Sequence, residues 1–278
     1  MNKRNSYKSK NKRYNFKFLG LVILLAFAVC CAGIIIYLSL DNNVKPENNN
    51  SNQNTEVSFD KTLEKFAKKN DLELSEWKQE YIDKAKLNPE LEDFVLNYPL
   101  KKDKEPKINL NEIKNYNSVP LLMQWDERWG YSKYAGDLMG FTGCGPTCLS
   151  MVSIYILKDN KYNPKYIADF SKKNGYSMMG SGSSWTLISE GGKKLGFDVV
   201  EIPLVEKRIV DNLKVGNPII CVVGPGDFTT KGHFIVMTGY VDGKIKINDP
   251  NSKERSEKLW EYNDIKDQIK NLWVCRAK

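Results

Sequence analysis

Residues 232–250 read GHFIVMTGYVDGKIKINDP, two strand-like runs that Asp242-Gly243 separates. An Asp-Gly pair between apolar runs is a strong hairpin signal, because both residues tolerate the backbone angles of a tight turn. Neighbouring strands lie about 5 Å apart. A hairpin closed at this turn therefore places Asp249, just past the second strand, close to His233 at the start of the first.

His233 is the only histidine in the chain, and histidine is the usual side chain that accepts and returns a proton near neutral pH. A candidate nucleophile, Cys144, stands in the segment GCGP at residues 143–146. The glycines permit a sharp bend, and Pro146 suits the first turn of a helix, whose unpaired N–H groups favour a thiolate. Thiol, imidazole and carboxylate are the components of a cysteine nucleophile, its base and the group that orients the base.

Each of these residues also has a common structural interpretation. A cysteine in a glycine-rich turn, a histidine in a core and an Asn-Asp-Pro turn at a strand end all occur without catalysis. Gln124, in the segment LLMQWDERWG at residues 121–130, is a fourth candidate, because a side-chain amide beside a nucleophile can donate to an oxyanion. A surface or core-edge amide is its alternative interpretation. The combination of the four residues points to thiol chemistry.

The C-terminal half of the chain predicts helices first and strands afterwards. Apolar spacing and capping residues predict helices over 144–157, from Asn163-Pro164 to near Gly175, and over 185–195. Strand-like runs follow at 198–202, 218–223, 233–241, 244–248 and 271–275. This order is typical of an α+β fold in which helices pack on one side of an antiparallel sheet.

Six separated motifs resemble those of the C39-like cysteine peptidases, which have a papain-like fold. In chain order they are Val119-Pro120, Gln124-Trp125-Asp126, Arg128-Trp129, Gly143-Cys144-Gly145-Pro146-Thr147, Gly232-His233-Phe234 and Asn248-Asp249-Pro250. The resemblance covers about residues 119–278. It implies that Cys144 is the nucleophile and that His233 is the general base and then the general acid. It also implies that Asp249 orients the histidine and that Gln124 donates to the oxyanion.

One departure limits what the resemblance implies. The better-known members of that family sit in ATP-driven exporters, where they trim double-glycine leaders. This chain has no GxxxxGK(S/T) loop that would hold the phosphates of ATP. The leader-peptidase role is therefore not expected here, and ATP is not an expected partner.

The first 40 residues predict a basic cytoplasmic tail and a membrane anchor. Residues 1–17 hold seven basic side chains and no acidic one, which leaves 35 basic and 34 acidic residues elsewhere, so nucleic acid is not an expected partner. The uncharged run Phe18–Leu40 would cover about 34 Å as a helix, enough to cross a bilayer. The basic flank predicts a single-pass protein of the cell membrane with its C-terminal part outside. A signal peptide cleaved near residues 26–28 is the alternative.

Two further segments precede the peptidase-like region. Residues 41–57 are rich in asparagine and poor in apolar residues, which favours a flexible linker. Residues 58–118 predict a helical extension, because Phe59, Leu63 and Phe66 recur at helical spacing. We expect these helices to pack on the main domain. A removable inhibitory segment or a protein-binding arm is the alternative.

Together these features predict a membrane-anchored, extracytoplasmic cysteine peptidase that acts on a peptide or protein substrate. A cell-wall peptide amidase or acyltransferase would use the same residues, and a non-catalytic papain-like binding module is a further alternative. The chain has no CxxC pair and no histidine cluster, so neither a metal nor another cofactor is expected. Cys148, Cys221 and Cys275 are expected to be buried and unpaired.

Overall fold

The computed structural model describes residues 50–105 and 107–278, with side chains from Phe59 onward. The predicted basic tail and membrane anchor, residues 1–40, lie outside the described residues. Within the described residues, no helix is both long and apolar enough to cross a membrane. The contacts divide the chain into two units, Met1–Thr55 and Glu56–Lys278, and the second unit contains all the candidate site residues.

A six-stranded sheet forms the centre of the second unit, and all its strand pairs are antiparallel, as predicted. In spatial order the strands are β5 (Asp198–Glu201), β10 (Ile269–Arg276), β6 (Ile219–Val223), β7 (His233–Val241), β8 (Lys244–Asn248) and β9 (Leu259–Trp260). The chain thus has the mixed helix-and-sheet architecture that the sequence predicts. The short strand β9 was not predicted, because two residues show no alternation.

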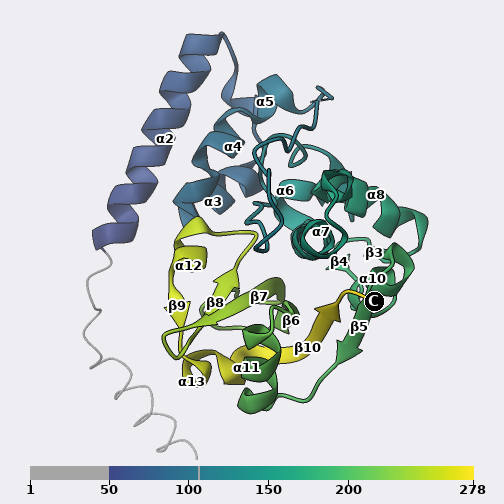
Figure 1. The fold of residues 1–278 in the computed structure, drawn as a ribbon. Coiled ribbons are helices and arrows are strands. Elements are labelled where there is room, and N and C mark those ends of the chain that lie inside the picture. The colour runs from purple at the N-terminus through teal and green to yellow at the C-terminus, as the bar shows by residue number, and fades with distance from the viewer. Residues whose placement is uncertain (1–49, 106) are drawn as a thin grey trace, which may run out of the picture. The chain divides into compact units, whose positions relative to one another are not determined.

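Helices cover both faces of the sheet, so the prediction that they pack on one side only is wrong. Every residue of β6 is buried, and its side chains alternate between two separate cores. One core lies against α7 (Cys144–Leu157) and α8 (Pro164–Lys173), and the other lies against α11 (Glu206–Lys214) and α13 (Tyr262–Ile265). Figure 1 shows these two pairs of helices at opposite sides of the sheet. The sequence signal for α11 is the pair Ile209 and Leu213, four residues apart and both buried.

The helix α7 has the predicted bounds, and α8 starts where Asn163 caps it by accepting a hydrogen bond from the N–H of Tyr166. The single helix predicted over 185–195 is instead two short helices, α9 (Thr186–Ser189) and α10 (Gly191–Leu195). Gly192 has a packing reason, because a Cβ there would meet Val199 of β5 at 2.5 Å. Close packing against β5 thus places a glycine where a continuous helix would prefer another residue.

Several short elements complete the peptidase-like region. They are β1 (Lys133–Tyr134), β2 (Asp137–Leu138), α6 (Met139–Thr142), η3 (Asn160–Tyr162), β3 (Ser177–Met178), β4 (Gly182–Ser183), α12 (Lys253–Glu257) and η4 (Lys266–Gln268). The pairs β1–β2 and β3–β4 form two small antiparallel ribbons. Elements of two to five residues carry too little periodicity for prediction from sequence.

The N-terminal extension is helical and packs on the domain, as expected. It consists of α2 (Asn50–Asn70), η1 (Leu74–Glu76), α3 (Gln79–Leu87), η2 (Pro89–Leu91), α4 (Glu92–Leu96) and α5 (Tyr98–Lys101). A third core joins its side chains to Tyr131 and Leu138 of the domain. The helix α2 begins inside the predicted linker 41–57, so that prediction is wrong for residues 50–57. Once the amphipathic turns after Phe59 have formed, adding further residues to a helix costs little.

Candidate active site

Cys144 is the first residue of α7, as the segment GCGP predicts. The residue is only partly buried, so Cys144 lies at the edge of the protein interior. Gly145 follows it because the small ribbon β3–β4 lies close by. A Cβ on Gly145 would stand 2.6 Å from the hydroxyl of Ser183. The glycine therefore lets this ribbon pack directly against the start of the helix that carries the thiol.

The hairpin brings His233 and Asp249 together, which confirms the geometric argument from the sequence. Val241 pairs with Lys244, and Val236 pairs with Asn248. Asp242 and Gly243 take positive φ angles of 50° and 80°, as a type I′ turn requires. The imidazole Nε2 lies 2.7 Å from Asp249 Oδ1. His233 is 8% exposed and Asp249 is fully buried, so solvent barely weakens this contact.

The thiol of Cys144 interacts with the same imidazole. Burial opposes the charged thiolate, but a hydrogen bond from His233, the positive charge of its ring and the backbone N–H groups of Phe234 and Gly145 outweigh it. Their combined effect lowers the pKa of Cys144 below that of an ordinary thiol. Because Nε2 faces Asp249, the other ring nitrogen, Nδ1, is the one available to the sulfur.

The pKa values of the imidazole and of the carboxylate are both shifted in the direction that favours the charged form. Burial would lower the pKa of His233, but the negative charges of Asp249 and Cys144 and the hydrogen bonds to both raise it to about 10. Burial would likewise raise the pKa of Asp249, but the charges of His233 and Arg255 and their hydrogen bonds lower it. The three groups therefore favour a thiolate–imidazolium pair beside a carboxylate.

Three residues that the sequence did not single out hold Asp249 in place. Arg255 Nε donates to Oδ2 at 2.6 Å, and the N–H of Asn251 donates to Oδ1 at 2.8 Å. The N–H of Asp249 itself donates to the hydroxyl of Ser256 at 2.8 Å. Arg255 and Ser256 both belong to α12, which Ser252 caps by accepting a hydrogen bond from the N–H of Arg255. A serine followed by Lys-Glu-Arg is the one sequence signal for this helix.

Gln124 is buried, with 4% of its surface exposed. Its backbone N–H donates to the carbonyl of Pro250, just after Asp249, at 2.7 Å. Its side-chain Nε2 donates to the carbonyl of Gly140, in the turn α6 that precedes Cys144, at 2.9 Å. Its Oε1 accepts no hydrogen bond from the described residues. Gln124 thus links the Asp249 loop to the segment before the thiol, and its contact with an oxyanion stays a prediction.

The other cysteines and the possible metal ligands among the described residues also bear on the candidate chemistry. Cys148, Cys221 and Cys275 are buried and unpaired, as predicted. Among residues 50–105 and 107–278, no cluster of histidine, cysteine, aspartate and glutamate side chains is arranged to hold a metal ion. The arrangement that the structure does hold is a nucleophilic sulfur with an adjacent proton donor and acceptor, which suits attack on a carbonyl carbon.

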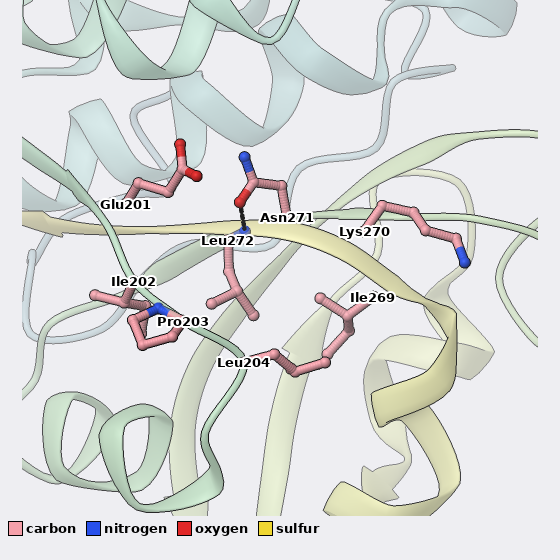
Figure 2. Close-up of a pocket in the computed structure, with 8 residues that line it drawn as sticks. All are labelled: Glu201, Ile202, Pro203, Leu204, Ile269, Lys270, Asn271 and Leu272. Carbon is pink, nitrogen blue, oxygen red and sulfur yellow. Dashed lines mark hydrogen bonds between the residues drawn. The ribbon is translucent and has the colours of Figure 1, made fainter. Parts of the chain in front are cut away.

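A separate cavity of about 510 Å³ lies at the β5 side of the sheet, between residues 201–204 at the end of β5 and residues 269–272 of β10. Figure 2 shows its lining and the hydrogen bond that the N–H of Leu272 donates to the side chain of Asn271. Its lining consists of Glu201, Ile202, Pro203, Leu204, Ile269, Lys270, Asn271 and Leu272. None of these residues is Cys144, His233 or Asp249, so the cavity is separate from the thiol chemistry.

Comparison with known proteins identifies the family of this region. The peptidase domain of Streptococcus ComA, a bi-functional ABC transporter involved in a quorum-sensing pathway, is 22% identical with a TM-score of 0.41, covering 58% of this chain and 99% of that domain. A Bacillus anthracis protein described as a C39-like peptidase is 16% identical with a TM-score of 0.36, covering 59% of this chain and 97% of its own. Curated proteins give no match. The model of the Peptidase_C39 like family matches residues 116–277, and the chain belongs to that family.

Proposed function

We propose that this protein is a membrane-anchored, extracytoplasmic cysteine peptidase with Cys144, His233 and Asp249 as its catalytic triad. The observation that carries the proposal is the contact of one imidazole with both the Cys144 thiol and the buried Asp249 carboxylate. Membership of a peptidase family supports a peptide substrate. The sequence features of residues 1–40 support the anchor and the outward orientation.

The reaction divides between the three side chains. The Cys144 thiolate attacks the peptide carbonyl carbon, forming a C–S bond and a tetrahedral oxyanion. His233 then donates its proton to the leaving nitrogen as the C–N bond breaks, which leaves a thioester and a free amine. Neutral His233 next takes a proton from water, whose oxygen attacks the thioester. The second intermediate expels the thiolate and releases the carboxylic acid.

Asp249 and the oxyanion donors support these steps without changing covalently. Asp249 accepts from Nε2 of His233 and so turns Nδ1 towards the sulfur while it stabilises the imidazolium. Backbone N–H groups at the start of α7, which have no partner within the helix, are the proposed backbone donors to the oxyanion. Gln124 is the proposed side-chain donor, because its Nε2 carries a second N–H besides the one that Gly140 accepts.

Alkylation of the full chain with iodoacetamide at pH 6 tests the thiol chemistry, with labelling read by mass spectrometry at each cysteine. We expect Cys144 to label fast, because its pKa is lowered and the residue is only partly buried. The exchange His233→Ala should slow labelling by about tenfold or more, since it removes the imidazolium that stabilises the thiolate. Lys246→Ala, an exposed change on β8 of the same hairpin, is the control and should leave the rate unchanged.

Incubation with peptide libraries and with cell-wall fragments then tests the substrate class, with Cys144→Ala as the inactive control. Cleavage of peptides that depends on Cys144 supports the peptidase. Cleavage of wall fragments alone supports an amidase, and fast labelling without any cleavage supports a binding module. Labelling of Cys144 at the rate of an ordinary exposed thiol would overturn the triad itself.

A further inference from the structure

Glu90 of the N-terminal extension contacts the loop that carries Asp249. It lies in η2, and its carboxylate accepts three hydrogen bonds from residues more than 160 positions away. The donors are the hydroxyl of Ser252 at 2.6 Å, the N–H of Lys253 at 2.7 Å and the N–H of Glu254 at 3.4 Å. A carboxylate at the start of a helix meets its unpaired N–H groups. Glu90 thus caps α12 from a different part of the chain.

A second contact reinforces this one. Asn88, two residues before Glu90, uses its Oδ1 to accept from the N–H of Glu90 at 3.1 Å and its Nδ2 to donate to the carbonyl of Asn251 at 3.1 Å. The indole of Trp125 donates to that same carbonyl at 3.4 Å. In Figure 1, α3, which precedes this segment, lies next to α12. The extension therefore fixes the loop both at Asn251 and at the first turn of α12.

The loop so fixed leads directly to the proposed triad. The hydroxyl of Ser252, which donates to Glu90, also accepts from the N–H of Arg255 at 3.1 Å. The carbonyl of Ser252 accepts from the hydroxyl of Ser256 at 2.7 Å. Arg255 and Ser256 are the side chains that hold Asp249. A continuous series of hydrogen bonds thus runs from Glu90 to Asp249, and from there to His233.

We propose that Glu90 is a positioning residue of this enzyme: by capping α12 it sets the orientation of Asp249 and, through His233, the ionisation of Cys144. The inference rests on the proposed function and extends it to the N-terminal extension, which then contributes to the working site. A carboxylate suits this position, because three donors converge on it and its two oxygens, which share one negative charge, can both accept.

The variant Glu90→Gln tests the proposal in the full chain, because glutamine keeps the size of the side chain and offers only one acceptor oxygen. If Asp249 is held less well, the pKa of His233 falls and that of Cys144 rises. The midpoint of the pH profile of iodoacetamide labelling at Cys144 should then move upward by about half a unit to one unit, lowering the rate at pH 6 by about three- to tenfold. Glu92→Gln is the matched control, since that carboxylate makes no hydrogen bond with the described residues, and its profile should equal that of the wild type.

The variant Ser252→Ala provides an independent test if Glu90→Gln folds poorly. It should move the labelling midpoint in the same direction, because it removes the hydroxyl that joins Glu90 to Arg255. A Glu90→Gln profile equal to the wild type, in a chain whose fast labelling depends on His233, would overturn the positioning role and leave the proposed function standing. Slow labelling of the wild type would overturn the proposed function, and the inference with it.

Discussion

Asp249 shares its carboxylate between an imidazole and a guanidinium. Oδ1 faces His233, and Oδ2 accepts from Arg255 Nε. With Cys144 and His233 ionised, the site holds two negative and two positive groups, because Arg255 supplies the second positive charge. A buried carboxylate without that balance would carry a large desolvation cost. Arg255 therefore allows Asp249 to stay ionised and fully buried beside a thiolate.

The sequence predicts the proposed reacting residues better than it predicts the residues that hold them in place. Cys144 and His233 stand in motifs with their own local meaning, and the hairpin turn places Asp249 by simple register. Arg255 carries no such signal, since an isolated arginine is most often a solvated surface residue. The contact of Glu90 with Ser252 could not be predicted from the sequence, because the two residues lie 162 positions apart and meet only in the folded chain.

The ionisation of the pair predicts how the chemistry depends on pH. A thiolate is present above the pKa of Cys144, which is lowered, and an imidazolium is present below the pKa of His233, which is raised to about 10. Alkylation at Cys144 should therefore rise with pH around a midpoint below the value of about 8.5 for an ordinary thiol. Peptide cleavage should follow the same rise and then fall again as the pH passes the pKa of His233.

Stopped-flow alkylation and initial cleavage rates between pH 4 and pH 11 measure the two limbs. Asp249→Asn is the informative variant, because it removes the charge that raises the pKa of His233 while it keeps the size of the side chain. Its alkylation midpoint should lie higher than that of the wild type. An unchanged midpoint in this variant would contradict the electrostatic role of Asp249.

At the scale of elements, long periodic segments are predicted well and short ones poorly. The apolar helix α7 and the hairpin strands β7 and β8 have the expected positions, because their patterns extend over many residues. The segment Thr186–Leu195 forms two short helices instead of the one predicted. Its Gly192 is required by a tertiary contact, because a Cβ there would meet Val199 of β5. Helical spacing within residues 185–195 cannot predict that contact, because Val199 lies outside this segment, in the strand β5.

The turn of the hairpin allows a matched test of its role. Gly243 has a φ of 80°, and a Cβ there would meet no atom within 4 Å, so the cost of Gly243→Ala is conformational alone. We expect a loss of about 1 to 2 kcal/mol in the free energy of unfolding, the cost of a left-handed conformation for alanine. Gly239→Ala is the control, because Gly239 lies in β7, also has open space, and has no positive φ.

Urea denaturation of the two variants gives the comparison. Gly239→Ala should change the free energy of unfolding little, or raise it slightly, because alanine restricts the unfolded chain more than glycine does. Equal losses from both exchanges would show that the turn conformation does not determine the stability of the hairpin.

At the scale of the whole second unit, the extension and the peptidase-like region share one core. Phe94 of α4 stacks on Tyr131 at a ring distance of 4.4 Å and lies against Gly130 and Gly140, where any Cβ would approach its ring to 2.6 Å or less. Gly140 is also the residue whose carbonyl holds the side chain of Gln124. The extension thus packs against the Gln124 side of the candidate site through Phe94 and contacts the Asp249 side through Glu90.

Because this core is shared, the extension and the peptidase-like region should unfold together in one transition. Phe94→Ala removes a side chain that is 2% exposed, and a phenylalanine lost from a core costs about 3 to 5 kcal/mol. For a unit of this size each kcal/mol lowers the melting temperature by about 2 to 4 °C. Leu87→Ala, at a leucine that is 86% exposed, is the control and should leave it unchanged. Differential scanning calorimetry checks the prediction: two separate transitions, with only the first moved by Phe94→Ala, would mean that the extension is an independent attachment.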